Sequence, residues 1–406
     1  MQHGSGYQNS GPDHSAQDHS AQDHSAPNHS GGTQQGAAFA NPASAGSASH
    51  PSSQGSASYP PPQAGQQPQQ FPPPRQSRAG RIERSELDQA TEMIQAIRRG
   101  FSSKVVGQSE LTRSLLVTLI SGGHILLESV PGLAKTLAAS TLASTVQASF
   151  ARIQCTPDLL PSDIIGTQVF DSRNSDFVTQ LGPVHHNFVL LDEINRSSAK
   201  TQSAMLEAMQ ERQTTIGGQT HQLPEPFMVL ATQNPIEEEG TYILPQAQMD
   251  RFLLKEIVDY PTMDEELEVL NRVETGALEQ RTVEAVLSSD HVFFLRDLAS
   301  RVYVDASIKR YIVELISATR HPAQVLGPDK AAYVEFGASP RGAIALLNVS
   351  RANAILNGRD HVIPEDVRAL RQAVLRHRLV LTFEAVADRV RPEMVIDAIF
   401  AAVSTP

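Results

Sequence analysis

One short segment combines small residues with a lysine and a threonine in an order suited to phosphate binding. Ser129-Val-Pro-Gly-Leu-Ala-Lys135-Thr136 lies between the apolar run 124–128 and a helical pattern that begins at Lys135. Small residues let backbone N–H groups converge on phosphate oxygens, and a helix N-terminus adds positive potential. Lys135 is predicted to neutralise the β- and γ-phosphates of a nucleotide, and Thr136 to offer its hydroxyl to Mg²⁺.

The segment departs from the general phosphate-loop pattern Gly-x-x-x-x-Gly-Lys-Ser/Thr at both glycines. Ser129 and Ala134 occupy these positions, while Pro131-Gly132 still supplies a tight turn. An ordinary strand-to-helix turn with a surface lysine is the alternative. The nucleotide-binding interpretation assigns cofactor contacts to a continuous run: Ser129, Val130, Pro131, Gly132, Leu133, Ala134, Lys135, Thr136 and Leu137.

Polar residues also follow two apolar runs further along the chain. Phe188-Val-Leu-Leu-Asp192-Glu193 ends in two acids, and unpaired carboxylates at the end of a buried strand are costly unless they have a role. Asp192 is predicted to hold Mg²⁺, and Glu193 to orient and deprotonate an attacking water. The alternative is a pair of acids that cap the next helix. Asn234 ends the run 227–234 and would contact the γ-phosphate or the water, unless it is only a turn residue before Pro235.

The elements that must position these residues follow an alternating pattern. Helical periodicity at 135–146 and 199–210 alternates with apolar runs typical of buried strands, which predicts a parallel sheet covered on both faces. The predicted strands are 124–128, 150–154, 188–191, 227–232 and 253–258. Two helices precede them, 85–99 with Ser85 as its N-cap and 109–120. Two hairpins are predicted, 168–170 with 178–180 and one around Gly217-Gly218.

The chain divides by composition into three parts. Residues 1–82 are rich in Gly, Ser, Ala, Gln, His and Pro, which predicts a disordered tail because too little apolar surface is available for burial. Residues 83–260 form the predicted α/β nucleotide-binding domain. Residues 261–406 read as a smaller helical lid domain, with helices at 263–275, 288–300, 306–319, 340–357 and 364–377.

A five-residue repeat, Asp-His-Ser-Ala-Gln, begins at Asp13 and recurs along the tail. Metal binding by its histidines is one interpretation. A low-complexity linker is favoured over it, because a flexible array has no fixed geometry to select a metal. The histidines concerned are His14, His19, His24 and His29.

Charge and composition exclude several classes of protein. The net charge is −11, of which residues 1–80 contribute −1, and an acidic body argues against nonspecific nucleic-acid binding. Cys155 is the only cysteine, so an intramolecular disulfide and a multi-cysteine metal site are excluded. The sequence contains neither a membrane-spanning apolar run nor a secretory leader. We therefore expect a cytoplasmic protein without a membrane span.

Six segments in this order resemble the AAA+ ATPases and, within them, the MoxR group of the helix-two-insert branch. The resemblance covers the chain from about residue 90 to its C-terminus. The segments are Leu126-Leu-Glu-Ser-Val-Pro-Gly-Leu-Ala-Lys-Thr136, Phe188-Val-Leu-Leu-Asp-Glu-Ile-Asn-Arg196, Gln202-Ser-Ala-Met-Leu-Glu-Ala-Met-Gln-Glu-Arg212, Ala231-Thr-Gln-Asn-Pro-Ile236, Met249-Asp-Arg-Phe252 and Ser339-Pro-Arg341. Alanine at position 134 is usual for this group, whereas Ser129 replaces the group's glycine.

The resemblance implies further site residues. Asn234 corresponds to the first sensor, and Arg251 to an arginine finger that reaches a neighbour's nucleotide. Arg341 corresponds to the second sensor on the lid, and Arg196 is a further candidate for contact between subunits. The adenine-side segment is Val106, Gly107 and Gln108.

The residues around the two sensor-type arginines agree with these roles. Ser339 and Pro340 are suited to the N-cap and first position of a helix, which places Arg341 in the first turn, where a bound anion could lie. A trans contact accounts for Arg251. Its alternative role is a salt bridge in the surroundings of Asp250.

The resemblance also implies a function. The expected protein is an ATP-hydrolysing, Mg²⁺-dependent ring, hexameric as in its relatives, with a chaperone-like role in assembly or maturation of protein complexes and von Willebrand factor A domain proteins as partners. Glu193-activated water and rotation of the lid would move the hairpins that line the pore.

Two alternatives remain at this stage. A nucleic-acid motor of the helicase-like branch is disfavoured, because the insert 156–184 holds four acids against Arg173 and 237–239 is a further acidic cluster. A nucleotide-gated scaffold with weak hydrolysis is suggested only by Ser129. The acids of the insert are Asp158, Asp163, Asp171 and Asp176.

Overall fold

The computed structural model describes residues 80–130, 132–235, 242, 244–276 and 287–406. The predicted tail, with its Asp-His-Ser-Ala-Gln repeat, lies outside the described residues as far as residue 79, and so do Pro131 and the acidic cluster 237–239. Within the described ranges, no helix combines the length and the apolar character that a membrane crossing requires.

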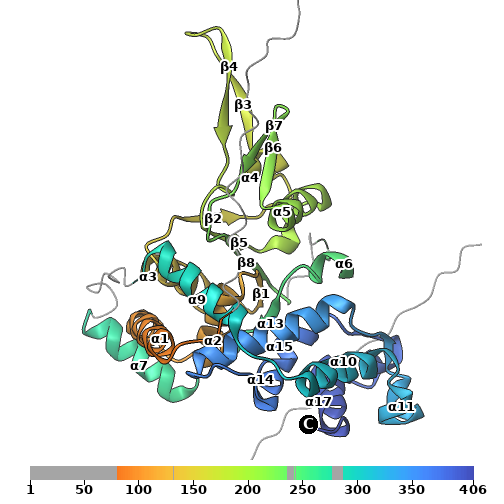
Figure 1. Ribbon diagram of the computed structural model, residues 1–406. Coiled ribbons are helices and arrows are strands. Elements are labelled where there is room, and N and C mark those ends of the chain that lie inside the picture. The colour runs from red at the N-terminus through yellow and green to blue at the C-terminus, as the bar shows by residue number, and fades with distance from the viewer. Residues whose placement is uncertain (1–79, 131, 236–241, 243, 277–286) are drawn as a thin grey trace, which may run out of the picture. The chain divides into compact units, whose positions relative to one another are not determined.

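Five of the described strands form one parallel sheet in the order β2-β5-β8-β1-β9, as the alternating pattern predicts (Figure 1). Each lies within one or two residues of its predicted range. Because all five run the same way, the loops after β1, β5 and β8 meet at one edge of the sheet. The strands are β1 Ile125–Glu128, β2 Phe150–Gln154, β5 Phe188–Asp192, β8 Met228–Gln233 and β9 Leu254–Ile257.

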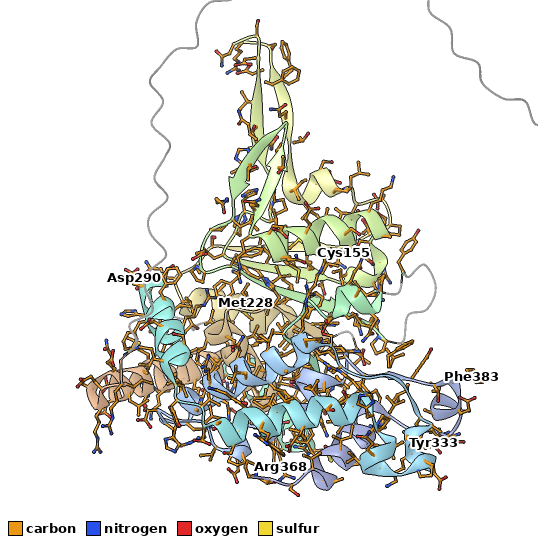
Figure 2. The ribbon with its side chains drawn as sticks, turned by 45° about the vertical axis from the view of Figure 1, so that its right-hand side comes forward. Cys155, Met228, Asp290, Tyr333, Arg368 and Phe383 are labelled. Carbon is orange, nitrogen blue, oxygen red and sulfur yellow. The ribbon has the colours of Figure 1, made fainter. Side chains whose placement is uncertain are left out.

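Alternate side chains of the sheet enter two separate hydrophobic clusters. Leu190 and Leu230 pack with the helices α1 Arg84–Lys104, α2 Ser109–Ser121 and α3 Lys135–Thr145. Leu191 and Val229 pack on the other face with α5 Ala199–Glu211. Met228, which begins β8, is fully buried in the first cluster (Figure 2). The sheet is therefore covered on both faces, which is why its strands are almost continuously apolar.

The first helix begins two residues earlier than predicted. Glu83, and not Ser85, is the N-cap of α1, and its backbone N–H donates to Glu86 Oε2 at 2.9 Å. An acidic residue at the third helical position can reach back in this way, so the helix start does not need the serine hydroxyl.

Two hairpins leave the α/β part side by side (Figure 1). The first pairs β3 Gly166–Asp171 with β4 Asp176–Leu181 and follows α4 Pro161–Ile165. The second pairs β6 Gln213–Ile216 with β7 Gln219–Gln222 across Gly217-Gly218, where both glycines have positive φ. The Gln168 side chain lies so close to Gly217 that a Cβ there would meet it at 2.1 Å. Both predicted hairpins are thus present, and they contact each other.

The chain after residue 261 is mostly helical and shares a core with the α/β part. Helices α9, α10, α13 and α17 contribute to the same hydrophobic cluster as α1, α2 and α3, whereas α7 buries none of its residues. The described helices of this part are α7 Met263–Glu274, α9 Ser289–Arg301, α10 Ala306–Arg320, α11 Ala323–Leu326, α12 Pro328–Ala331, α13 Pro340–Leu356, α14 Pro364–Ala369, α15 Arg371–Leu375, α16 Phe383–Ala387 and α17 Pro392–Ala402. Two short helices belong to the α/β part: the 3₁₀ helix η1 Ile194–Arg196 and α6 Gln246–Met249.

Two predictions for this helical part are wrong in detail. The single helix predicted over 364–377 is two helices, because buried Leu370 leaves helical dihedral angles with φ −117° and ψ 22°. A small antiparallel pair, β10 Val334–Phe336 with β11 Val380–Leu381, joins segments more than forty residues apart. Strands of two or three residues are too short to show a period in the sequence.

Candidate nucleotide-binding site

The predicted phosphate loop connects β1 to α3, and among its described residues Ala134 is the one non-glycine position with a positive φ. Gly132 has φ +88° and Ala134 has φ +52°, and α3 begins at Lys135. The position that is glycine in the general pattern is therefore left-handed here and is filled by alanine. Ser129, at the other glycine position, has no positive φ, and its N–H donates to Gln233 O at 3.2 Å. Serine is thus accommodated without backbone strain.

Lys135 extends across this loop. Its Nζ donates to the carbonyl oxygens of Ser129 at 3.4 Å and Val130 at 3.5 Å. Thr136, half-buried, follows in the first turn of α3. The loop therefore brings one cation and one hydroxyl to the carboxyl edge of the sheet, where helix N-terminal N–H groups favour an anion.

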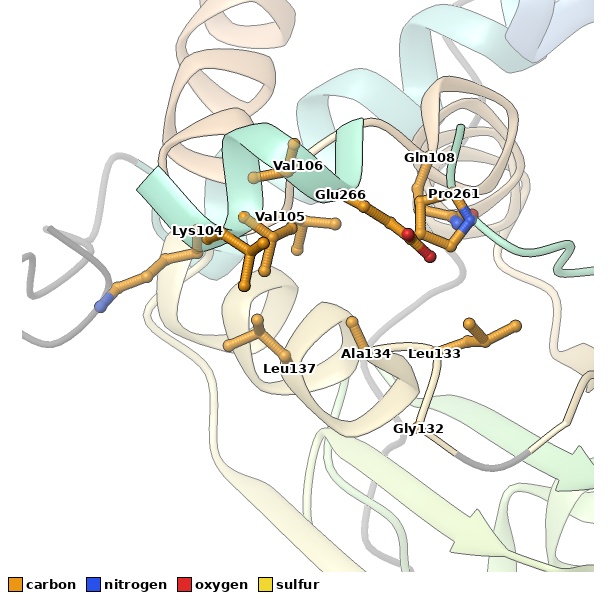
Figure 3. A pocket seen from close by; sticks show the side chains of 12 residues that line it. Lys104, Val105, Val106, Gln108, Gly132, Leu133, Ala134, Leu137, Pro261 and Glu266 are labelled. Carbon is orange, nitrogen blue, oxygen red and sulfur yellow. The ribbon is translucent and has the colours of Figure 1, made fainter. Parts of the chain in front are cut away.

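A cavity of about 340 Å³ adjoins the loop (Figure 3). Its volume falls within the range of small-molecule sites. The predicted residues Val106 and Gln108 lie in its lining together with Gly132, Leu133, Ala134 and Leu137. Gly107 is not in the lining; a Cβ at Gly107 would meet the Glu265 carboxylate at 2.3 Å.

Sequence reasoning missed the far wall of this cavity. Lys104 and Val105 from the end of α1 line it, and Pro261, Glu266, Val269 and Leu270 come from the segment that includes α7. No local signal could have identified the latter, because α7 follows the loop by more than a hundred residues. Only the packing of the chain brings it there.

The acids at the end of β5 are held by polar partners from the neighbouring strands. Asp192 Oδ1 accepts from Thr232 Oγ1 at 2.7 Å, and Oδ2 accepts from Arg152 Nη2 at 2.6 Å and Nε at 3.2 Å. Glu193 Oε2 accepts from Gln154 Nε2 at 3.1 Å and pairs with Arg196 Nε at 3.2 Å. Arg196 therefore contacts Glu193 of its own chain.

The alternative that these acids cap the next helix holds only by position, because Glu193 is the N-cap residue of η1 but its side chain makes no capping hydrogen bond there. Ser198 is the N-cap of α5, and its hydroxyl accepts from Thr201 N. Glu193 instead has φ +58°, and its N–H donates to Thr232 Oγ1 at 2.8 Å. Strained residues that the surrounding structure holds in place cluster at functional sites. Gln108, Ala134 and Glu193 all share this left-handed backbone.

The partners Arg152, Gln154 and Thr232 were missed in the sequence. The strand register explains why Gln154 is near the acids, because Gln154 lies opposite Asp192 in the β2–β5 pair. Asn234, the predicted first sensor, is buried and follows β8 directly in the chain. Within the sheet, β8 lies between β5 and β1. Cys155 is also buried here, and burial, followed by the negative charges of Asp192 and Glu193, raises the pKa of its thiol to about 12. That thiol is an inert core residue.

The two predicted arginines lie at the opposite edge of the sheet. Arg251 and Arg341 line one cavity of about 140 Å³ together with His124, Met209, Gln210 and Asp250. His124 directly precedes β1, whereas the phosphate loop directly follows it. At about 3.3 Å per residue, the strand alone separates the two by roughly 13 Å. Arg341 therefore faces away from the phosphate loop of its own chain.

Among the residues that the structure describes, no acid forms an ion pair with either guanidinium group of the arginine pair. Asp250 pairs with Arg378 Nε at 2.8 Å and not with Arg251. Arg251 Nε has no hydrogen-bond partner in the part of the chain that the structure describes. Burial and nearby Arg212 lower the pKa of His124 to about 3, so this imidazole is neutral and adds no charge. The cavity is consequently cationic through its arginines.

Comparison with known proteins places this arrangement in a class. Residues 124–254 match the ATPase family associated with various cellular activities (AAA), and residues 329–399 match the AAA lid domain. The parallel sheet with its loop after β1, and the helices that follow it, are thus those of an AAA+ ATPase.

Individual relatives indicate to which group of AAA+ ATPases the chain belongs. The chain is 48% identical over 302 residues to Chaperone MoxR1 of Mycobacterium tuberculosis, covering 74% of this chain and 79% of that protein. It is 45% identical over 303 residues to the protein YeaC of Bacillus subtilis, covering 74% and 91%. A solved structure from Cytophaga hutchinsonii is 44% identical with a TM-score of 0.75, covering 79% and 97%. The chain belongs to the MoxR group of AAA+ ATPases.

Proposed function

We propose that this protein hydrolyses ATP at sites shared between two copies of the chain. The observation that carries the proposal is the separation of the two charged edges. The phosphate loop and Glu193 lie at the carboxyl edge of the sheet, while Arg251 and Arg341 lie at the amino edge and pair with no acid in the described part of the chain. A second copy, placed head to tail, brings its arginines to the first copy's nucleotide. Repetition of such a heterologous contact closes a ring, for which six copies are expected.

The residues of the carboxyl edge fit ATP and magnesium. Lys135 would turn from the carbonyls of its own loop onto the β- and γ-phosphates, and the cavity beside Val106 and Gln108 would take the base. Asp192 retains one lone pair on Oδ1 after its three hydrogen bonds, and Thr136 offers a hydroxyl at the same edge. These two residues would hold Mg²⁺, whose charge stabilises the phosphate oxygens.

The remaining polar residues have proposed roles in the hydrolytic step. Glu193 would leave Gln154 and Arg196 and take a proton from the attacking water. Asn234 would orient that water. Arg251 and Arg341 of the neighbouring copy would stabilise charge on the transferred phosphate.

The biological role proposed is chaperone-like assembly or maturation of protein complexes, as expected for the MoxR group. The name of the Mycobacterium tuberculosis relative supports it. Von Willebrand factor A domain proteins are the proposed partners. The tip of the β3–β4 hairpin favours protein over nucleic acid, because the acids Asp171 and Asp176 lie beside Phe170 and Phe177, which are exposed and pack edge to face at 5.4 Å.

Steady-state ATP hydrolysis by wild type and Glu193→Gln, with the mass of each measured with and without ATP, tests the proposal. Wild type should turn over and assemble with ATP, whereas Glu193→Gln should still bind ATP and assemble but lose turnover by about 100-fold or more. Equal turnover in the two proteins would remove Glu193 from the mechanism. A mass that does not respond to ATP in either protein would contradict the shared site.

A further inference from the structure

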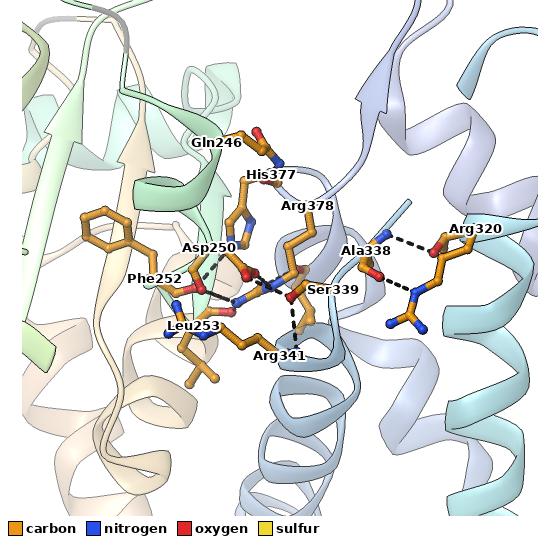
Figure 4. A network of polar contacts seen from close by, with 12 residues as sticks. Gln246, Asp250, Phe252, Leu253, Arg320, Ala338, Ser339, Arg341, His377 and Arg378 are labelled. Carbon is orange, nitrogen blue, oxygen red and sulfur yellow. Dashed lines mark hydrogen bonds and ion pairs between the residues drawn. The ribbon is translucent and has the colours of Figure 1, made fainter. Parts of the chain in front are cut away.

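Asp250 connects the two segments that carry the arginine pair, although they are some ninety residues apart (Figure 4). Asp250 Oδ2 accepts from Ser339 Oγ at 2.8 Å. Ser339 is the N-cap of α13, and its hydroxyl oxygen accepts from Arg341 N at 3.1 Å. Asp250, which directly precedes Arg251, is therefore linked through the Ser339 hydroxyl to the backbone N–H of Arg341.

Arg378 fixes the other side of the same carboxylate. Its Nε donates to Asp250 Oδ1 at 2.8 Å, and its Nη atoms donate to the carbonyls of Phe252 at 2.7 Å and Leu253 at 3.1 Å. His377 Nε2 also contacts Phe252 O at 3.1 Å. One side chain thus holds residues on both sides of Arg251 in the chain, while the Arg251 side chain itself lines the cavity.

Arg378 is buried in its ion pair with Asp250, so separating the two charges is costly. Arg378 is 4% exposed, and desolvation lowers its pKa to about 10, with the Asp250 carboxylate opposing that shift. The guanidinium therefore remains charged at neutral pH. A buried charge of this kind is destabilising without its partner, so Asp250 and Arg378 stay together.

The same pairing keeps Arg251 free to bind an anion. The Asp250 carboxylate is the acid next to Arg251 in the chain, yet its oxygens are occupied by Arg378 and Ser339. Neither Arg251 nor Arg341 forms an ion pair with an acid among the described residues; the contact recorded for Arg341 comes from its backbone N–H.

We propose that Asp250, Ser339 and Arg378 are positioning residues that hold Arg251 and Arg341 as one anion-binding pair for the neighbouring copy's ATP. The inference rests on the proposed function. It adds that the two arginines act as a unit, and that breaking the Asp250–Ser339 link impairs the neighbour's site and leaves the chain's own phosphate loop intact.

Ser339→Ala tests this link, because it removes the hydroxyl and keeps the buried Asp250–Arg378 pair. Ser339→Thr, which retains a hydroxyl, is the matched control. Turnover of Ser339→Ala should fall about 10- to 100-fold, since small displacements of catalytic groups have effects of this size. Its affinity for a fluorescent ATP analogue as a dilute monomer should match wild type, and Ser339→Thr should restore most of the turnover.

Mixing subunits separates a trans role from a folding defect. Glu193→Gln subunits lack the proposed catalytic base but carry an intact arginine pair, whereas Ser339→Ala subunits keep the base and have an impaired pair. A mixture should turn over faster than either protein alone. No gain on mixing, together with reduced nucleotide affinity of the Ser339→Ala monomer, would show a cis or folding role and overturn the inference.

A second readout makes the test independent of turnover. In the Glu193→Gln background, Ser339→Ala should raise the ATP concentration needed for assembly several-fold, as measured by mass. If Arg251→Ala loses assembly or turnover while Ser339→Ala matches wild type in both, the positioning inference fails and the proposed function stands. If wild type neither turns over nor assembles with ATP, the proposed function fails and the inference fails with it.

Discussion

The two edges of the central sheet differ in how their charged side chains are paired. At the carboxyl edge, Asp192 and Glu193 each have hydrogen-bond and ion-pair partners within the same chain. At the amino edge, Arg251 and Arg341 face a shared cavity, and the nearest acid, Asp250, is already taken. Charged side chains that have partners within the chain are stable without a ligand. Arginines that pair with no acid among the described residues indicate that a second molecule supplies the anion.

The packing of the helical part explains why Arg341, the predicted second sensor, does not lie near its own phosphate loop. The helices from α9 onward share a core with α1 and α2, and α13 packs against α2. That packing directs the start of α13 to the amino edge of the sheet. A nucleotide bound by the same chain would therefore lie at the wrong edge for Arg341.

The largest effect is expected from the amino edge. Arg251→Ala should lower turnover by about 10³-fold or more, as for other arginines that act on a neighbour's phosphate. Binding of ATP to the isolated chain should be unchanged, because the phosphate loop lies at the other edge. Turnover and monomer nucleotide affinity, measured on the same preparation, check both statements. Loss of monomer affinity would place Arg251 at its own chain's site and break the comparison.

An intermediate effect is expected at the carboxyl edge. Arg152→Met removes a half-exposed cation that contacts Asp192 Oδ2 at 2.6 Å. Removing a nearby positive charge should lower the Mg²⁺ concentration needed for ATP binding about two- to fivefold, a small change because solvent screens an exposed pair. Mg²⁺ titration of ATP binding in the Glu193→Gln background measures this shift.

Arg152→Lys is the matched control for that experiment. It keeps the charge but loses the fork that donates two hydrogen bonds to one oxygen. Its Mg²⁺ requirement should stay near that of wild type. A higher Mg²⁺ requirement in Arg152→Met would mean that Arg152 only orients Asp192 and does not compete with the metal.

The smallest effects concern the two positions of the phosphate loop that usually hold glycine. Ala134 has φ +52°, which costs an L-residue roughly 1 kcal/mol, so Ala134→Gly should raise the midpoint of thermal unfolding slightly. Ser129 has no such strain, so Ser129→Gly should lower the free energy of unfolding by roughly 0.5–1 kcal/mol through unfolded-state entropy, and with it the midpoint slightly. Thermal unfolding of the two variants checks the opposite signs. Shifts in the same direction would contradict the backbone assignment.

Much of the candidate site followed from local patterns. The run 188–191 is apolar because β5 is buried on both faces, and the acids Asp192 and Glu193 appear where the strand reaches the edge. The small residues of the loop and Lys135 are neighbours in sequence, so their shared position needed no tertiary information. The helix break at Leu370 was not predictable in this way, because its side chain is buried by distant elements.

The sequence by itself determined the parallel sheet, the phosphate loop and the order of the motifs, since apolar periodicity and turn chemistry act over a few residues. Only the tertiary structure decided which residues hold Asp192 and Glu193, which helix closes the cavity beside the loop, and at which edge Arg341 lies. These depend on strand register and on the packing of helices far apart in the chain. Asp250, Ser339 and Arg378 became one network for the same reason: hydrogen bonds between distant segments are fixed by the packed core and leave no period in the sequence.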